Sequence, residues 1–204
     1  MIILIIFGVV LAYLLGSLPT AYIFGKTLKN IDIREHGSGN MGATNVFRTV
    51  GKTPGLIVLV IDFLKGLLAV TMIPIILKRF IPAYAENSAW ILILFGVAVI
   101  CGHVWTIFLN FKGGKGVATT AGVLAGISPL ILILCLAVFS TVFYIWRYVS
   151  LGSIIAALFL PIFAVIFNNN IYYVLFCSGL TILAIIKHRE NIRRLIRGEE
   201  KRLI

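Results

Sequence analysis

The sequence has little charge for its length, and acidic side chains are especially rare. Only 12% of its 204 residues are charged, with 7 Asp and Glu against 18 Lys and Arg, whereas 60% are hydrophobic. A soluble domain averages about 25% charged residues, and one of this size has too little interior to bury so much apolar surface. The composition therefore excludes a soluble or disordered protein and predicts an integral membrane protein. In such a chain the net charge of +11 favours a membrane face and anionic ligands over nucleic acid.

Several motifs that would carry chemistry are also absent. Cys101, Cys135 and Cys177 stand far apart in apolar runs, so neither a disulfide framework nor a zinc site is predicted. No His is followed five residues later by Asp, which excludes the His/Asp pair of many acyltransferases. No carboxylate lies near a Ser or Cys to build a catalytic triad. We therefore expect no metal and no organic cofactor.

Long apolar runs mark the expected membrane spans. A membrane-crossing helix needs about 20 mostly apolar residues. Five runs fit this length: 2–24, 55–77, 88–109, 150–167 and 171–186. The stretch 117–146 would form a helix of about 45 Å, which exceeds a hydrocarbon core of about 30 Å. It also contains Pro129, so it is either one long tilted helix or two shorter ones.

Cationic segments decide the predicted topology. Segments 25–54 and 187–204 are rich in Lys and Arg, so both should face the cytoplasm. An even number of crossings must then separate them, which requires two helices in 117–146. We therefore predict one domain over residues 1–204, an all-α bundle of seven transmembrane helices, one or two of them short. Its N-terminus lies outside and its C-terminus in the cytoplasm, although the Lys78-Arg79 pair then falls outside.

The first polar cluster on the predicted inner side runs from His36 to Arg48 and holds three glycines in six residues. Glycine lets the backbone adopt positive φ and approach a ligand closely, and arginine offers a fork that suits phosphate. The alternative is a flexible loop with a Ser or Thr helix cap. The candidate site residues in this cluster are Ser38, Gly39, Asn40, Thr44, Asn45 and Arg48.

The second cluster, 111–120, is a Gly-rich segment that leads into a predicted helix. Such a segment can hold an anion with its backbone N–H groups, and two lysines add positive charge. It is not a Walker A loop, because Gly116 follows Lys115 where Ser or Thr would bind magnesium, which argues against an NTPase. The alternative is a short inner loop with ordinary topological lysines. The candidates are Gly113, Gly114, Lys115, Gly116 and Thr119.

The third cluster lies in the cationic tail. If the tail is helical, His188 and Asn191 share a face and can contact one substrate together. A polybasic helix resting on anionic headgroups is the alternative for the cluster. We favour that alternative only for its arginines, Arg193, Arg194 and Arg197.

Polar residues within the spans have structural alternatives. Asp62 and Lys65 are three residues apart in one predicted span, where isolated charges are costly, so we expect a mutual ion pair. His103 is expected to be a hydrogen-bonded core residue of the third span. Ser150 and Ser153, at the inner end of another span, are expected to cap that helix or to touch a bound phosphate.

The sequence closely resembles the bacterial PlsY family over nearly its whole length. Three runs resemble signature motifs of that family: HGSGNMGATNVFRTVGK (36–52), GHVWTIFLNFKGGKGVATTAG (102–122) and HRENIRRLIRGEE (188–200). IDFLKG (61–66) and RYVSLGSIIAA (147–157) resemble further segments. The resemblance implies a seven-span acyltransferase of the bacterial inner membrane. It would join the acyl group of a fatty acyl-phosphate to glycerol-3-phosphate, releasing lysophosphatidic acid and phosphate, as the first acylation of phospholipid synthesis.

The resemblance also implies roles for the clusters. The 1-hydroxyl of glycerol-3-phosphate would attack the acyl carbonyl directly, a donor phosphate oxygen would accept the proton, and no acyl-enzyme would form. The expected catalytic residues are Ser38, Arg48, Lys115, His188 and Asn191. The expected substrate-binding residues are Gly39, Asn40, Thr44, Asn45, Gly113, Gly114, Gly116, Thr119 and Ser153. Which phosphate each loop holds is open, and no obligate protein partner is expected.

A membrane carrier of an anionic phosphorylated metabolite is the alternative function. Basic loops and seven spans would serve a carrier as well. Carriers, however, usually place polar groups near the middle of the bilayer and have paired halves. Here the polar clusters lie at the predicted inner surface, and the sequence has no visible repeat.

Overall fold

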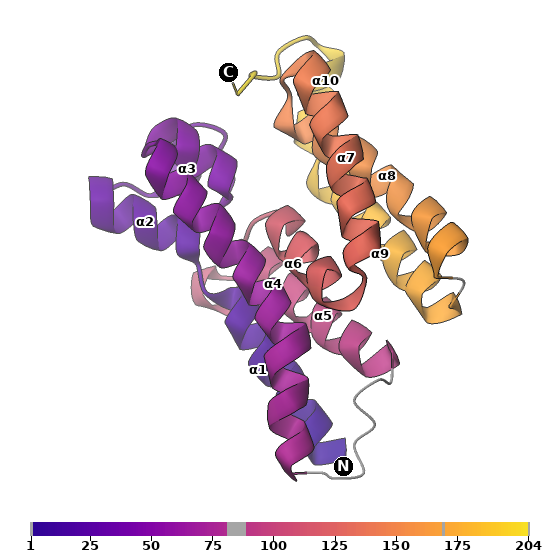
Figure 1. The fold of residues 1–204 in the computed structure, drawn as a ribbon. Helices are drawn as coiled ribbons and strands as arrows, with labels where there is room; N and C mark the ends of the chain where they lie inside the picture. Colours follow the sequence, from indigo (N-terminus) through magenta and orange to yellow (C-terminus); the bar gives the residue numbers. More distant parts are fainter. Residues whose placement is uncertain (1, 81–88, 169, 204) are drawn as a thin grey trace. The chain divides into compact units, whose positions relative to one another are not determined.

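The chain is helical in the part that the structure describes (Figure 1). The computed structural model describes residues 2–80, 89–168 and 170–203. Its helices are α1 (Ile2–Ser17), α2 (Thr20–Lys29), η1 (Ile33–Glu35), α3 (Ala43–Thr49), α4 (Lys52–Phe80), α5 (Ala89–Val104), η2 (Ile107–Leu109), α6 (Val117–Ile127), α7 (Pro129–Trp146), α8 (Val149–Phe167), α9 (Ile171–Lys187) and α10 (Arg189–Ile196). They form two compact units that divide between Ile127 and Ser128. The all-α class is confirmed, whereas the single domain stays a prediction.

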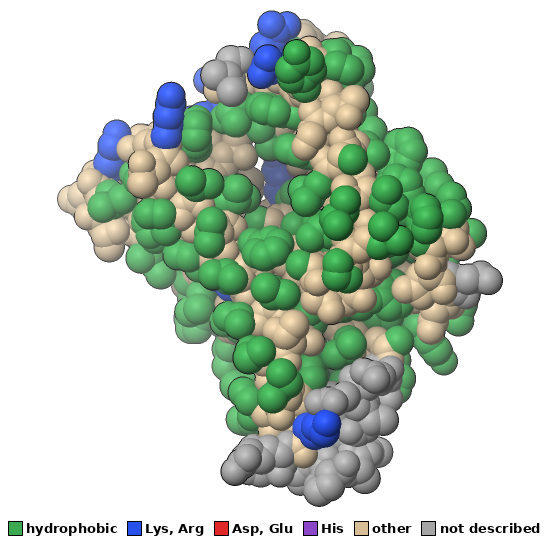
Figure 2. Space-filling view, in the orientation of Figure 1, with side chains coloured by type: hydrophobic (Ala, Val, Ile, Leu, Met, Phe, Trp, Pro, Cys, Tyr) green, Lys and Arg blue, Asp and Glu red, His purple; other side chains and the backbone are tan. Residues whose placement is uncertain are grey.

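Most of these helices are apolar enough for a bilayer. Five segments of the described chain have the length and composition of a membrane span: Ile2–Lys29, Lys52–Lys78, Ala89–Leu109, Pro129–Trp146 and Val149–Phe167. A sixth is added if α9 and α10, bent by 59°, are taken as one, and α6 is a shorter apolar helix. Large apolar side chains are exposed along most of these helices, and they dominate the face in Figure 2. Such a surface suits lipid contact, while the count of seven spans and the orientation stay predictions.

Proline breaks the chain where two predicted spans meet and also interrupts the first span. The prediction of two helices within 117–146 is confirmed, because α6 ends at Ile127 and Pro129 begins α7. The span predicted over 2–24 lies within the apolar segment Ile2–Lys29, but it consists of two helices, because α1 ends at Ser17 and Pro19 precedes α2. Proline lacks an N–H group and disfavours helical geometry in the residue before it.

The third predicted span, 88–109, ends its α-helix five residues early. Helix α5 stops at Val104, and the chain then forms the short turn η2 and an irregular segment. The N–H of Gly113 donates to the carbonyl of Val104 at 3.1 Å, and the N–H of Gly114 donates to that of His103 at 3.0 Å. These bonds satisfy carbonyls that a helix end leaves without partners. The second Gly-rich segment therefore folds back onto the end of α5.

The first unit is built on two close helix pairs, α1 with α5 and α4 with α6. Gly16 and Gly102 lie at the first contact, and Gly66 and Gly122 lie at the second. A Cβ atom at any of these four positions would overlap a backbone carbonyl of the facing helix. Small residues that allow backbones to approach are typical of membrane helix pairs. Because α6 follows the second Gly-rich segment directly, its packing on α4 fixes one end of that segment.

The second unit is built around α8, which contacts both α7 and α9. The hydroxyl of Thr181 on α9 donates to the carbonyl of Ala157 on α8 at 2.6 Å. The thiol of Cys135 on α7 lies 3.7 Å from the carbonyl of Ala156, on the same helix α8. Helix α10 packs on α8 and α9. This arrangement brings the tail of the chain against the start of α8.

Candidate functional site

The first Gly-rich cluster is a folded loop held by the side chain of Asn45. Its Oδ1 accepts the backbone N–H of Ser38 at 2.9 Å. Its Nδ2 donates to the carbonyls of Ile33 at 3.0 Å and His36 at 2.9 Å. Asn45 is only 1% exposed, and both amide hydrogens are used. The structure therefore gives this residue a positioning role, and its direct contact with substrate stays a prediction.

The sequence did not predict the ion pair between Asp32 and Arg34, which lies just before the same loop in the chain. Asp32 caps η1 by accepting the backbone N–H of Arg34, and its carboxylate also accepts two bonds from the Arg34 guanidinium, the shorter at 2.6 Å. The guanidinium lies 5.5 Å from the centre of the Tyr22 ring. The side-chain hydrogen bond from Arg34 lowers the pKa of Asp32 to about 2. The carboxylate is therefore ionised and occupied at neutral pH.

The remaining residues of the first cluster lie on the loop and on α3. Ser38 and Gly39 are exposed, and Asn40 is partly buried just before the helix. Thr44 and Arg48, four residues apart on α3, share one face of that helix. Gly42 occupies the N-cap position of α3 without a side-chain bond. The alternative of a Ser or Thr cap is therefore wrong for this helix.

The second cluster is a strap between α5 and α6. Backbone bonds to α5 already use the N–H groups of Gly113 and Gly114, so these groups shape the strap. Gly116 has φ of +81°, a conformation that favours glycine, and its carbonyl accepts the N–H of Thr120 at 2.7 Å in the first turn of α6. The first N–H groups of α6 are therefore the backbone donors suited to an anion, with the partly buried Lys115 just before them.

Thr119 lies in the contact between α4 and α6, and its contact with substrate stays a prediction. It is fully buried, and its carbonyl oxygen faces Gly66 of α4. Among the described side chains, its hydroxyl is one of three buried polar atoms without a hydrogen-bond partner. The residue therefore belongs to the α4–α6 contact.

The predicted Asp62–Lys65 ion pair is confirmed. The two side chains are 2% exposed each, and Lys65 Nζ lies 2.7 Å from Asp62 Oδ1. The ammonium also donates to the Thr20 hydroxyl at 2.8 Å and to the Leu18 carbonyl at 2.6 Å, and the Thr20 hydroxyl donates to Asp62. All three ammonium hydrogens therefore have acceptors. The pair satisfies the carbonyl that the break before Pro19 leaves without a helical partner.

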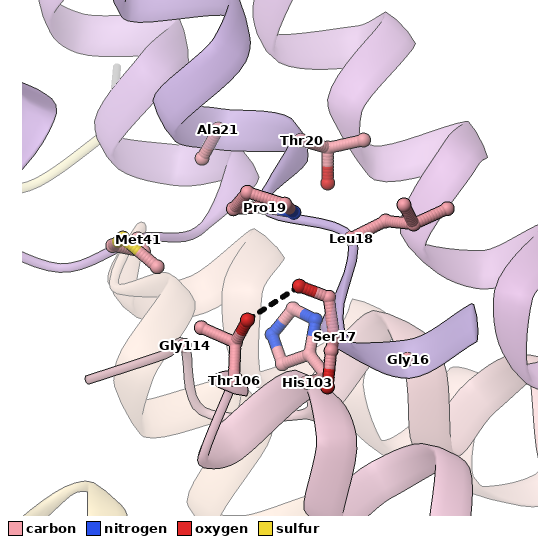
Figure 3. Close-up of a pocket in the computed structure, with 10 residues that line it drawn as sticks. All are labelled: Gly16, Ser17, Leu18, Pro19, Thr20, Ala21, Met41, His103, Thr106 and Gly114. Atoms are coloured by element: carbon pink, nitrogen blue, oxygen red, sulfur yellow. Dashed lines mark hydrogen bonds between the residues drawn. The ribbon is translucent and has the colours of Figure 1, made fainter. Parts of the chain in front are cut away.

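The two Gly-rich clusters meet at a small cavity beside this pair (Figure 3). Met41 from the first cluster and Gly114 from the second line it, together with Gly16, Ser17, Leu18, Pro19, Thr20, Ala21, His103 and Thr106. The hydroxyl of Thr106 donates to the carbonyl of Ser17. His103 is a buried core residue of the third span, as predicted, and it lies in the last turn of α5. The first unit therefore joins the first two clusters.

The third cluster lies in the second unit. His188 ends α9 and precedes α10, and its Nδ1–H donates to the carbonyl of Ala184 at 2.8 Å. Because a carbonyl oxygen can only accept, this bond fixes Nδ1 as the protonated nitrogen. Asn191 lies on α10, and both side chains are more than 90% buried. Because both side chains are buried, they do not belong to a solvated cationic helix face that rests on lipid headgroups.

A carboxylate that sequence reasoning missed holds this cluster together. Glu200 Oε1 accepts bonds from Ser150 Oγ and Asn191 Nδ2, both at 2.7 Å, and Oε2 accepts one from Arg194 Nε at 2.7 Å. Burial alone would raise the pKa of Glu200, but these three hydrogen bonds lower it below the usual value. Arg194 therefore serves this network, and the interpretation of Arg194 as only a headgroup contact is wrong.

The expected helix caps at the start of α8 are absent. Tyr148 occupies the N-cap position without a side-chain bond. Ser150 instead donates to the tail, and the Ser153 hydroxyl donates to the carbonyl of Val149 at 2.8 Å. Both serines are buried, because the tail covers this end of α8. Contact between Ser153 and a substrate stays a prediction.

The described residues contain no group of three or more His, Cys, Asp or Glu side chains that could hold a metal ion. Their polar clusters combine cations, neutral donors and glycine backbone. Each carboxylate named above already accepts at least two hydrogen bonds. The arrangement therefore suits phosphate binding better than proton abstraction by a carboxylate.

Comparisons with known proteins agree with this chemistry. Residues 6–198 match the family described as glycerol-3-phosphate acyltransferase. A protein of that name from Desulforamulus reducens is 44% identical over 93% of this chain and 90% of its own length. Glycerol-3-phosphate acyltransferase 2 from Moorella thermoacetica is 45% identical over 96% of each chain.

Two crystal structures of PlsY, an integral membrane glycerol 3-phosphate acyltransferase, are also similar. The glycerol 3-phosphate form is 39% identical with a TM-score of 0.87, and the lysophosphatidic acid form is 38% identical with a TM-score of 0.84. Each comparison covers 97% of this chain and 94% of the solved one. Sequence and fold agree over almost the whole length, and the chain belongs to the glycerol-3-phosphate acyltransferase family.

Proposed function

We propose that this protein transfers a fatty acyl group from an acyl-phosphate to the 1-hydroxyl of sn-glycerol-3-phosphate, giving lysophosphatidic acid and phosphate. Family membership supports glycerol-3-phosphate as the acceptor, because similar PlsY structures are a glycerol 3-phosphate form and a lysophosphatidic acid form. The observation that carries the proposal is the meeting of two Gly-rich segments beside one cavity, with Arg48 on α3 and Lys115 before α6. Two phosphorylated substrates need such a concentration of donors and positive charge.

The occupied carboxylates support direct transfer without a protein base. Asp32 and Glu200 both have lowered pKa values, and Asp62 is paired with Lys65. None of these three is suited to take a proton from an alcohol at neutral pH. An acyl-phosphate is an activated anhydride whose own phosphate can accept that proton. The new ester C–O bond forms, the bond from the acyl carbon to the phosphate oxygen breaks, and phosphate leaves with the proton.

The chain then contributes position and charge. We assign Arg48 and Lys115 to phosphate oxygens, where they stabilise the negative charge of the leaving group. Ser38, His188 and Asn191 orient the reacting groups, since alignment alone can supply much of the rate enhancement. The expected substrate contacts are Gly39, Asn40, Thr44, Gly113, Gly114, Gly116 and Ser153.

We place the reaction at the cytoplasmic face of the bacterial inner membrane. The support is the concentration of Lys and Arg in segments 25–54 and 187–204, which the positive-inside rule assigns to the cytoplasm. The lipid bilayer would receive the acyl chains of donor and product. A cysteine introduced at the exposed Ser38 should react with a membrane-impermeant maleimide in inverted vesicles and stay protected in intact cells.

The donor is tested with purified protein in detergent. Palmitoyl-phosphate and palmitoyl-CoA are each supplied with labelled glycerol-3-phosphate, and labelled lysophosphatidic acid is measured. We expect product only with palmitoyl-phosphate, and the Lys115→Ala and Asn191→Ala variants should lose most of it. Product only with palmitoyl-CoA would contradict the donor assignment. Uptake of glycerol-3-phosphate into proteoliposomes without phosphate release would favour the carrier.

A further inference from the structure

His103 lines the cavity where the two Gly-rich clusters meet (Figure 3). It occupies the last turn of α5 and is 9% exposed. The cavity has room for about one water molecule, so the side chains that line it, His103 among them, lie close together. This position raises the question of what the side chain does for the two clusters.

One edge of the imidazole faces the glycine segments. A Cβ atom on Gly114 would overlap His103 Nε2, lie 3.1 Å from Cε1, and lie 2.8 Å from the carbonyl oxygen of Met41. The ring therefore packs against the backbone of the strap, at a place where that backbone also faces Met41. Only a residue without a Cβ atom allows this approach.

The other edge faces the buried ion pair. His103 Nδ1 lies 3.8 Å from Asp62 Oδ1. Asp62 is held in turn by Lys65 and Thr20, and Lys65 is bound to the carbonyl of Leu18 at the helix break. The imidazole thus rests on a network that includes α2, α4 and the break between α1 and α2, and this network fixes its position.

The backbone of His103 holds the same strap. Its carbonyl accepts the N–H of Gly114 at 3.0 Å, and the next carbonyl, that of Val104, accepts the N–H of Gly113 at 3.1 Å. Backbone and side chain of one turn therefore contact the segment that presents Lys115. A displacement of the ring would move the strap and the lysine together.

We propose that His103 is a positioning residue of the acyltransferase, which sets the place of the 112–116 strap and of Met41 through its contact between Asp62 and Gly114. The proposal rests on the proposed function, because it takes the strap as a phosphate-binding segment. If His103 only filled space in the core, an apolar side chain of similar size would serve equally well, because the contacts of Nδ1 and Nε2 would have no role. The Asp62 carboxylate beside Nδ1 and the glycine backbone packed against Nε2 are the reasons for the stronger assignment.

The first test measures the strap directly. Hydrogen–deuterium exchange of the purified protein is followed by mass spectrometry in wild type and His103→Ala. The amides of Gly113 and Gly114 should exchange at least tenfold faster in the variant, while peptides from α8 are unchanged. Unchanged exchange at the strap would overturn the proposal, and this readout does not depend on any activity.

The second test separates positioning from general stability. Phe95→Leu is the matched control, because Phe95 is fully buried in the same α5 and lies against Gly8 of α1, outside the two clusters. We expect His103→Ala to raise KM for glycerol-3-phosphate or the acyl donor and to lower kcat/KM by about 10- to 100-fold, since small misplacements have effects of this size. Phe95→Leu should lower Tm and leave both KM values within twofold of wild type. Wild-type KM values in His103→Ala together with wild-type exchange at the strap, or equal KM changes in Phe95→Leu, would overturn the proposal.

Two conservative variants locate the contact that matters. The amide nitrogen of Gln reaches the place of Nε2, and that of Asn reaches the place of Nδ1. His103→Gln should restore KM more fully than His103→Asn, because the strap lies on the Nε2 side. Equal KM values in these variants would contradict the assignment. If exchange at the strap accelerates while KM and kcat stay normal, the strap is displaced without affecting catalysis, and the phosphate-binding role of the strap fails instead.

Discussion

The close contact between α4 and α6 gives the most quantitative prediction, that Gly122→Ala destabilises the protein. A Cβ atom at Gly122 would overlap the carbonyl oxygen of Phe63 and lie 2.8 Å from its carbonyl carbon and 2.9 Å from the nitrogen of Leu67. Ordinary contacts of a Cβ atom are 3.4–4 Å, so the overlap with the Phe63 oxygen requires the helices to separate locally by about 1 Å or more. Overpacking of this kind costs about 1–3 kcal/mol.

The matched control is Gly179→Ala on α9, because a Cβ atom there meets no heavy atom within 4 Å. Both substitutions gain up to about 1 kcal/mol in helix propensity. The difference between the two variants therefore isolates the packing cost, about 1–3 kcal/mol, or a Tm lower by about 2–12 °C for a chain of this size.

The assay is thermal unfolding of both variants in one detergent, with acyl transfer measured below the lower Tm. Because α6 begins at the strap, Gly122→Ala should also lower kcat/KM, whereas Gly179→Ala should not change it. Equal Tm values for the two variants would refute the backbone contact between α4 and α6. A Gly122→Ala protein with the lower Tm but normal kcat/KM would refute the link between this contact and the site.

Three further predictions concern the polar interior. Asn45→Ala should lower kcat/KM about 10- to 100-fold, and Asn45→Asp should not restore it because a carboxylate lacks the two N–H donors; a rate within twofold of wild type would contradict the positioning role. Asp62→Asn or Lys65→Met alone should destabilise by about 3–5 kcal/mol in thermal or denaturant unfolding, and the double variant by less, because each single change leaves a buried charge without its partner; additive losses would contradict this. The folded-state pKa of Asp32 is about 2, below its ordinary value, so its stabilisation is present above pH 4 and is lost as the pH falls toward 2. The Tm difference between wild type and Asp32→Asn should therefore shrink over that range, and a constant difference would exclude the ion pair as its source.

The sequence was sufficient to predict the elements that depend on local pattern. Apolar runs bounded by cations gave α8 and α9 within a residue or two, and Pro129 correctly divided 117–146. Pro19 is an equally clear break signal in the sequence. The apolar run continues past it, however, and the length of that run led to the prediction of one uninterrupted span. The break is stabilised by Lys65, whose ammonium donates to the carbonyl of Leu18, 47 positions earlier in the chain. Such a long-range contact has no local signature.

The candidate site was predictable in composition but not in the division of labour among its residues. Asn45 and Thr44 are neighbouring polar residues, yet only the fold shows that Asn45 is consumed by loop backbone. Likewise Glu199 and Glu200 are adjacent residues of the same type, and the sequence does not distinguish them. In the structure Glu200 is the one that accepts hydrogen bonds from Ser150 and Asn191. Which donor faces a ligand is decided by tertiary contacts, so pattern alone assigns too many residues to the substrate.

The central claim, direct transfer from acyl-phosphate to glycerol-3-phosphate, is tested by one measurement on the purified protein. Palmitoyl-phosphate is added to a stoichiometric amount of enzyme, first alone and then with glycerol-3-phosphate, and phosphate and lysophosphatidic acid are quantified in the same samples. We predict no burst of phosphate before the acceptor is added and a one-to-one yield of the two products afterwards. A burst that matches the enzyme concentration would show an acyl-enzyme, and phosphate release without lysophosphatidic acid would contradict acyl transfer altogether.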